Sequence, residues 1–147
     1  MPTSPLIIGL ISLTLGISLF ALWKGGPAER LGGAVVTTNV LLALISALFL
    51  PPSLESLSRL TLDGLTALGL LVIALRYASF WLGGAMLLYA GQFSLHAFYM
   101  VTSREIDLTH VRLNNLNFLG ISICLAAGTI IGWRRRVVSR RAAAQAF

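Results

Sequence analysis

Four polar residues in an otherwise uncharged stretch are the best candidates for chemistry in this chain. They are spaced i, i+3, i+7 and i+10, which places them on one face of a helix. This polar stripe consists of Tyr89, Gln92, His96 and Tyr99. Histidine titrates near neutral pH and its ring nitrogens can ligate a metal, so the stripe is a candidate quinone head-group site, proton relay or cofactor contact. Hydrogen bonding between helices is the more common use of such residues, and either use requires a stripe that faces protein or water.

Asp63 is the acidic residue deepest within an apolar segment. Intramembrane carboxylates are candidates for carrying protons or binding cations. Glu55, Arg59 and Asp63 are spaced i, i+4 and i+8, so a helix would align them as a ladder of alternating charge. We therefore expect Arg59 to neutralise Asp63, which argues against a proton-carrier role for this carboxylate.

The segment from 102 to 112 is the most polar part of the chain. Glu105, Asp107 and His110 lie in it, but their spacing matches no strong metal-binding motif. We expect a solvated loop at the membrane surface and no metal site. His110 would then lie outside the membrane, so a haem held jointly by His96 and His110 is not expected.

The chain carries no recognisable catalytic motif, which argues against an enzyme and identifies no cofactor. There is no phosphate-binding glycine loop and no nucleophile–base pair. The single cysteine, Cys124, lies in an apolar run without a neighbouring charge and is expected to pack as a small apolar side chain. Three amides precede this run, of which one is expected to cap a helix start and the others to line an outward-facing cavity: Asn114, Asn115 and Asn117.

The composition identifies the surroundings in which the chain folds. Of the 147 residues, 56% are hydrophobic and 11% are charged, and the mean hydropathy is +0.85. A soluble domain has about 25% charged residues, and a disordered chain is poor in apolar ones. Both classes are excluded. The sequence predicts an all-α, polytopic transmembrane helical bundle that forms a single integral membrane domain.

Charges, glycines and prolines divide the chain into five apolar segments. The predicted spans are about 6–23, 33–50, 53–75, 77–101 and 113–133. In the third span only residues 64–75 are fully apolar, and they cover about 18 Å of helix where the hydrocarbon core is about 30 Å thick. We expect this helix to begin with Ser53 as its N-cap, and its outer end either to emerge into the lipid head groups or to pack its charged face inward. A bundle of four spans is the alternative.

The basic residues predict the orientation in the membrane. Five of them occupy the basic tail predicted at 134–147: Arg134, Arg135, Arg136, Arg140 and Arg141. With five spans, eight of the eleven basic residues fall on the side of this tail, as the positive-inside rule requires. We expect a cell (inner) membrane protein with its N-terminus outside and its C-terminus in the cytoplasm. The tail arginines would contact anionic lipid head groups, and nucleic acid is not an expected partner.

Small residues at every fourth position predict one face of close helix packing. This glycine face consists of Gly120, Cys124, Gly128 and Gly132, and it suits a helix of the same chain, another subunit or a second copy. The lack of chemical motifs favours a non-catalytic accessory or assembly subunit of a larger membrane complex, bound through this face. Two alternatives are a transporter or channel component working as an oligomer, and a quinone- or cofactor-binding membrane protein that uses the polar stripe.

Overall fold

The protein is a bundle of five helices joined by short connections. The computed structural model describes residues 5–145, and within that range it contains helices and no strand. The helices are α1 (Pro5–Lys24), α2 (Pro27–Phe49), α3 (Pro52–Tyr77), α4 (Phe80–Val101) and α5 (Leu108–Gln145). The prediction of an all-α helical bundle is confirmed.

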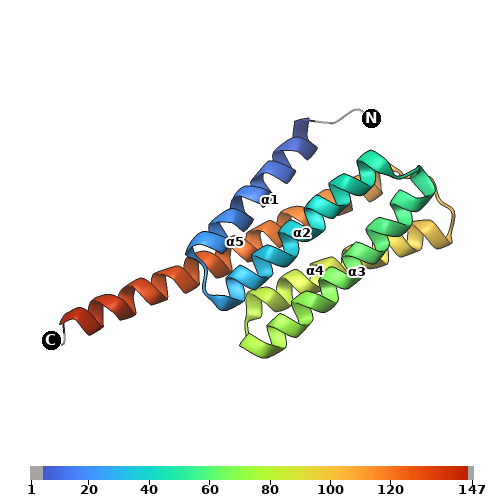
Figure 1. The fold of residues 1–147 in the computed structure, drawn as a ribbon. Helices are drawn as coiled ribbons and strands as arrows, with labels where there is room; N and C mark the ends of the chain where they lie inside the picture. The colour runs from blue at the N-terminus through green and yellow to red at the C-terminus, as the bar shows by residue number, and fades with distance from the viewer. Residues whose placement is uncertain (1–4, 146–147) are drawn as a thin grey trace.

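Successive helices run antiparallel, and the last one closes the bundle (Figure 1). α3 packs against both α2 and α4, while α5 returns to pack against α4 and α1. The start of α1 and the end of α5 lie at opposite ends of the bundle, and the C-terminal part of α5 extends beyond the other helices (Figure 1). The polar connection between α4 and α5 therefore lies at the same end as the start of α1.

Four of the helices, α1, α2, α3 and α5, are long and apolar enough to cross a membrane. α4 carries no charged residue, but the polar stripe lowers its hydropathy. Its 22 residues extend over about 33 Å, and α3 and α5 pack on either side of it. Tyr89, Gln92 and Tyr99 are buried there, as expected of a stripe that faces protein. Because these polar side chains face the neighbouring helices and not lipid, α4 can lie within the membrane beside α3 and α5.

Prolines set the starts of α2 and α3. Both helices begin at a proline, Pro27 and Pro52, whose fixed φ suits the first turn and whose missing N–H would have no helical partner there. The prediction that Ser53 caps α3 is wrong, because Pro51 occupies the cap position. α2 begins at Pro27 rather than at 33, because the carboxylate of Glu29 accepts the Gly26 N–H (2.6 Å) and caps the first turn.

α5 is longer at both ends than the span predicted at 113–133. It begins at Leu108 because Asp107 Oδ1 accepts the backbone N–H of His110 (2.8 Å), which is the hydrogen bond of an N-cap side chain. At the other end the helix continues to Gln145, so the predicted basic tail is helical as far as the structure describes it. Positions 146 and 147 of that tail lie outside the described residues.

The glycine face of α5 is covered by α4 of the same chain. A Cβ added at Gly120 would lie 2.9 Å from Leu88 Cδ1, and one at Gly128 would overlap the indole ring of Trp81. Both Leu88 and Trp81 belong to α4 and pack against the central apolar cluster. The two helices approach this closely because the face has almost no side chain of its own.

The other two members of the glycine face are also in contact within the chain. Cys124 Sγ faces Gly84 of α4, since a Cβ at Gly84 would lie 3.3 Å from the sulfur. Gly132 faces Glu29, whose Oε1 would lie 2.8 Å from an added Cβ. All four members of the face therefore have packing partners inside this chain.

Candidate functional site

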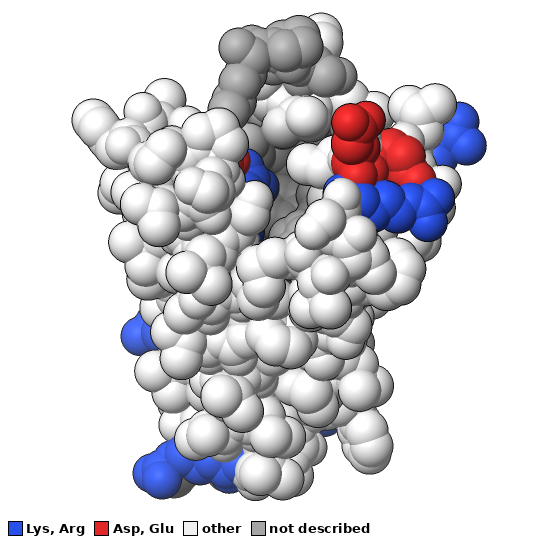
Figure 2. Space-filling view, turned by 90° about the vertical axis from the view of Figure 1, so that its right-hand side faces the viewer, with Lys and Arg blue, Asp and Glu red and all other residues white. Residues whose placement is uncertain are grey.

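A cavity of about 270 Å³ opens between the helices at the end of the bundle where α1 begins. α1 leans away from α2 toward its N-terminus (Figure 1), and a Cβ placed on Gly9 or Gly16 would meet no atom within 4 Å. Deeper in the bundle, α1 is held to α5 by a hydrogen bond between the buried hydroxyls of Thr14 and Ser122 (2.7 Å). Figure 2 shows a hollow at this end of the molecule, with charged atoms recessed in it.

The cavity is amphipathic. Its apolar lining comes mainly from α1 and α2 and includes Ile7, Ile11 and Leu44. Its polar lining comes mainly from the other three helices and includes Arg59, Asp63, Gln92, His96, Asn114 and Asn115. Small-molecule sites commonly combine a largely apolar wall with a few convergent polar groups.

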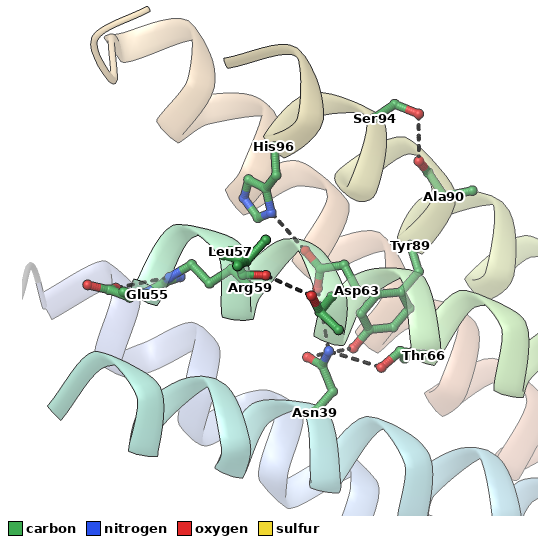
Figure 3. A network of polar contacts seen from close by, with 11 residues as sticks. Asn39, Glu55, Leu57, Arg59, Asp63, Thr66, Tyr89, Ala90, Ser94 and His96 are labelled. Atoms are coloured by element: carbon green, nitrogen blue, oxygen red, sulfur yellow. Dashed lines mark hydrogen bonds and ion pairs between the residues drawn. The ribbon is translucent and has the colours of Figure 1, made fainter. Parts of the chain in front are cut away.

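Asp63 and His96 form the central polar pair of this wall (Figure 3). His96 Nδ1 lies 2.8 Å from Asp63 Oδ2, and Asp63 is 4% exposed. An ionised carboxylate only accepts hydrogen bonds, so with Asp63 in that form Nδ1 carries the hydrogen. Nε2 of His96 makes no hydrogen bond to any residue in 5–145 and is the ring nitrogen available to a ligand.

A second layer of hydrogen bonds holds Asp63 in place (Figure 3). Asn39 Nδ2 donates to Asp63 Oδ1 (3.4 Å) and to Thr66 Oγ1 (3.0 Å). The Tyr89 hydroxyl donates to Asn39 Oδ1 (3.4 Å). Tyr89 is fully buried and does not line the cavity, so it acts behind the site by orienting Asn39.

The prediction that Arg59 neutralises Asp63 is wrong. The Arg59 guanidinium donates from Nε and Nη2 to Glu55 Oε1, at 3.0 and 2.8 Å. Helical side chains lean toward the N-terminus of their helix, so Arg59 reaches back to Glu55 and not forward to Asp63. Asp63 is paired with His96 from α4 instead, which removes the argument against a proton-exchanging role for this carboxylate.

Two buried amide oxygens in the cavity wall have no hydrogen-bond partner among the described residues. They are Gln92 Oε1 and Asn114 Oδ1, and both residues line the cavity. Most buried polar atoms in proteins are hydrogen-bonded, and an unpaired one costs about 1–3 kcal/mol. The prediction that one of the asparagines caps α5 is wrong, because the early start of this helix leaves Asn114 and Asn115 on the cavity wall.

His110 lies beside the cavity pair and not in a solvated loop, which corrects a further prediction. It is 9% exposed, and its ring centroid lies 5.3 Å from that of His96 and 4.6 Å from that of Tyr99. The Tyr99 hydroxyl donates to Asp107 Oδ1 (2.6 Å). The early helix start at Asp107 turns His110 inward, and the only sequence signal for this was the Asp107-x-x-His110 capping spacing.

These contacts place five polar side chains, the polar relay, in a row from the cavity to the α4–α5 connection. It consists of Asp63, His96, His110, Tyr99 and Asp107. Hydrogen bonds join its first two and its last two members, and ring contacts join the middle ones. The polar stripe of α4 is thereby divided: Gln92 and His96 line the cavity, Tyr89 supports it and Tyr99 belongs to the relay. Among residues 5–145, no group of three or more His, Cys, Asp or Glu is placed to hold a metal ion.

Asp107 makes the outer end of the relay sensitive to acid. The Tyr99 hydroxyl and the His110 backbone N–H both bond its carboxylate and lower its pKa below the ordinary value. A lowered pKa in the folded state stabilises the fold above the unfolded pKa of about 3.9, and that stability is lost as the pH falls through the folded pKa. Thermal melts should show Asp107→Asn less stable than the parent at pH 7, with the gap closing toward pH 3. A gap independent of pH would show that the charge of Asp107 contributes nothing.

The chain matches no known family model, no curated protein and no solved structure.

Proposed function

We propose that this integral membrane protein binds a small amphipathic molecule of the hydroquinone type in the cavity between its helices. One observation carries the proposal: two unpaired buried acceptors, Gln92 Oε1 and Asn114 Oδ1, lie in the same cavity as the Asp63–His96 pair and face an apolar wall. A ligand that offers hydrogen-bond donors would satisfy both oxygens.

The division of the cavity into two walls supports this class of ligand. A hydroquinone has a flat apolar ring with two hydroxyls, and each hydroxyl donates one hydrogen bond and accepts others. The hydroxyl hydrogens suit Gln92 and Asn114, while the Arg59 guanidinium supplies a donor. An apolar substituent would lie along α1 and α2, where the lining is formed by residues such as Ile7 and Leu44.

The polar relay supports a ligand that exchanges protons. Histidine is suited to accept and release a proton near neutral pH, and the Asp63 carboxylate orients the His96 ring so that Nε2 remains available. His110, Tyr99 and Asp107 continue from this ring toward the polar end of the bundle. A proton released in the cavity would thus have titratable groups leading to water.

The distribution of charge supports an orientation with the cavity toward the outside of the cell (inner) membrane. Eight of the eleven basic residues lie at the end where α5 leaves the bundle, together with Glu29 as the sole acidic residue. The cavity end carries three arginines and the other four acidic residues. By the positive-inside rule the basic end, with the C-terminus, would lie in the cytoplasm.

The two other functions considered from the sequence have less support. The accessory-subunit hypothesis assigned the glycine face to a partner, but Leu88 and Trp81 cover that face. A channel would need a path to the opposite end, and fully buried apolar side chains such as Leu70 and Ile121 fill the bundle beyond the cavity. A binding site fits this arrangement better than a pore.

Titration with a soluble hydroquinone tests the proposal. The protein in dodecylmaltoside is titrated with decylubiquinol and decylubiquinone by isothermal titration calorimetry. We expect the quinol to bind, and Gln92→Leu to weaken its affinity about ten-fold, the effect of one hydrogen bond to a buried acceptor. The same substitution should leave the melting temperature unchanged or higher, because it replaces an unpaired buried oxygen with an apolar group.

Two asparagines of α5 provide a matched control. Asn114→Leu removes an amide of the cavity wall and should weaken quinol binding like Gln92→Leu. Asn117→Leu makes the same chemical change one turn further along, at a residue that does not line the cavity, and should bind normally. Failure of both forms of the ligand to bind, or equal binding by the Asn114 and Asn117 variants, would refute the proposed site.

A further inference from the structure

A second hollow, of about 750 Å³, lies at the opposite end of the bundle, between the α1–α2 turn and the emerging part of α5. It is lined by four basic side chains: Lys24, Arg30, Arg136 and Arg140. The hollow is independent of the cavity discussed above, since the two share no lining residue.

The turn and the helix are fastened together, so the shape of this hollow is built into the fold. Arg136 Nη2 donates to the backbone carbonyl of Lys24 (2.8 Å), and its Nη1 lies 3.4 Å from Glu29 Oε2. Glu29 also accepts the N–H of Gly26. The two contacts of Arg136 join residues more than a hundred positions apart in the chain.

The charge of the hollow is left largely uncompensated. Glu29 is the only carboxylate near the hollow in the part of the chain that the structure describes, and it is already engaged by Arg136 and Gly26. Lys24, Arg30 and Arg140 make no ion pair within residues 5–145. Lys24 Nζ lies over the Trp23 ring, 3.9 Å from its centroid, so a group with negative charge would find three cations that lack a carboxylate partner around one concave surface.

The remaining lining indicates that the negatively charged group belongs to a lipid. Trp23 and Trp133 line the hollow beside the basic residues, and tryptophan is enriched where a membrane meets water. Leu31 and Val137 add apolar surface to the same lining. Cations beside tryptophans and aliphatic side chains match a molecule with an anionic head and an apolar body.

We propose that this hollow is a specific binding site for the head group of an anionic phospholipid. Lys24, Arg30 and Arg140 contact the phosphate and any further acidic group, while the acyl chains leave past Trp23 and Trp133 into the bilayer. Of the five tail arginines, Arg136 shapes the site and Arg140 contacts the lipid. Arg134, Arg135 and Arg141 are exposed and do not line the hollow.

The test compares two double variants with the same change of charge. The intact protein in dodecylmaltoside is titrated with dioleoylphosphatidylglycerol, and bound lipid is counted by native mass spectrometry. We expect one lipid to bind tightly to the parent. Arg30→Gln combined with Arg140→Gln should weaken this binding about ten-fold or more, since each basic contact to an anionic membrane contributes about a factor of five. Arg135→Gln combined with Arg141→Gln should bind within about two-fold of the parent.

Three results would overturn the proposal. Equal losses in the two double variants would mean that the tail attracts lipid diffusely. Equal binding of dioleoylphosphatidylcholine to the parent would mean that the anionic head is not recognised. Displacement of the lipid by inorganic phosphate at similar concentration would mean that the hollow binds a free anion and not a lipid. The last two measurements use the unmodified protein, so they decide the matter even if a variant fails to fold.

Discussion

Replacing Gly128 with alanine is expected to lower the free energy of unfolding by about 1–3 kcal/mol, the usual cost of overpacking. The added methyl group would overlap the Trp81 ring. The ring cannot retreat, because Gly32 of α2 lies at its far edge, where an added Cβ would be 2.9 Å from Trp81 Cη2. Thermal unfolding in dodecylmaltoside, followed by circular dichroism, measures the loss.

Gly83 provides the matched control for this substitution. It is a helical glycine like Gly128, although in the first turn of α4, and a Cβ at Gly83 would meet nothing within 4 Å. Gly83→Ala should therefore leave the melting temperature unchanged or raise it, because alanine is favoured in a helix by up to about 1 kcal/mol. If both alanine variants melted at the same temperature, the close packing of Trp81 between two glycines would not contribute to stability.

The second large effect is expected from Asp63→Ala. Asp63 accepts hydrogen bonds from Asn39 and His96 while almost fully buried. Removing its carboxylate leaves His96 Nδ1 without its hydrogen-bond partner, and an unsatisfied buried group costs about 1–3 kcal/mol. We expect a lower melting temperature and loss of quinol binding together, since the His96 ring loses the bond that orients it.

Two further substitutions separate the effect of the buried hydrogen bonds of Asp63 from the effect of removing a negative charge. Asp63→Asn keeps an acceptor for His96 and should retain more stability than Asp63→Ala. Glu105→Ala removes a carboxylate from the exposed α4–α5 connection and should change stability by less than about 0.5 kcal/mol. A melting temperature for Asp63→Ala as high as that of Glu105→Ala would contradict the buried network around Asp63.

Several local patterns correctly predicted features of the fold. Apolar segments separated by charges, glycines and prolines predicted the number of helices and their order. The spacing of the polar stripe predicted that one face of α4 turns inward, and its buried members do so. Small residues at every fourth position from Gly120 to Gly132 predicted a face of close packing. The spacing did not identify Leu88 and Trp81 as residues that cover this face.

The errors came from helix ends and from side-chain partners. The sequence predicts that α5 begins at 113, because the segment before it is polar and resembles a loop. The Asp107 cap begins the helix five residues earlier, at Leu108, and this turns His110 inward. The i, i+4 spacing predicts a pair between Arg59 and Asp63, but Glu55 has the same spacing on the other side. Helical side chains lean toward the N-terminus of their helix, which favours Glu55. That second error was avoidable from the sequence.

By itself, the amino-acid sequence determined which segments are helical, which faces of them are polar or small, and at which end of the bundle the positive charge collects. These properties depend on neighbours within a turn or two. Only the tertiary structure decided that Asp63 meets His96, that Gln92 and Asn114 share one cavity, and that Arg136 reaches the α1–α2 turn. The residues brought together in this way are 22 to 112 positions apart. Their meeting depends on how far each helix is rotated and tilted against the others, which local spacing does not encode.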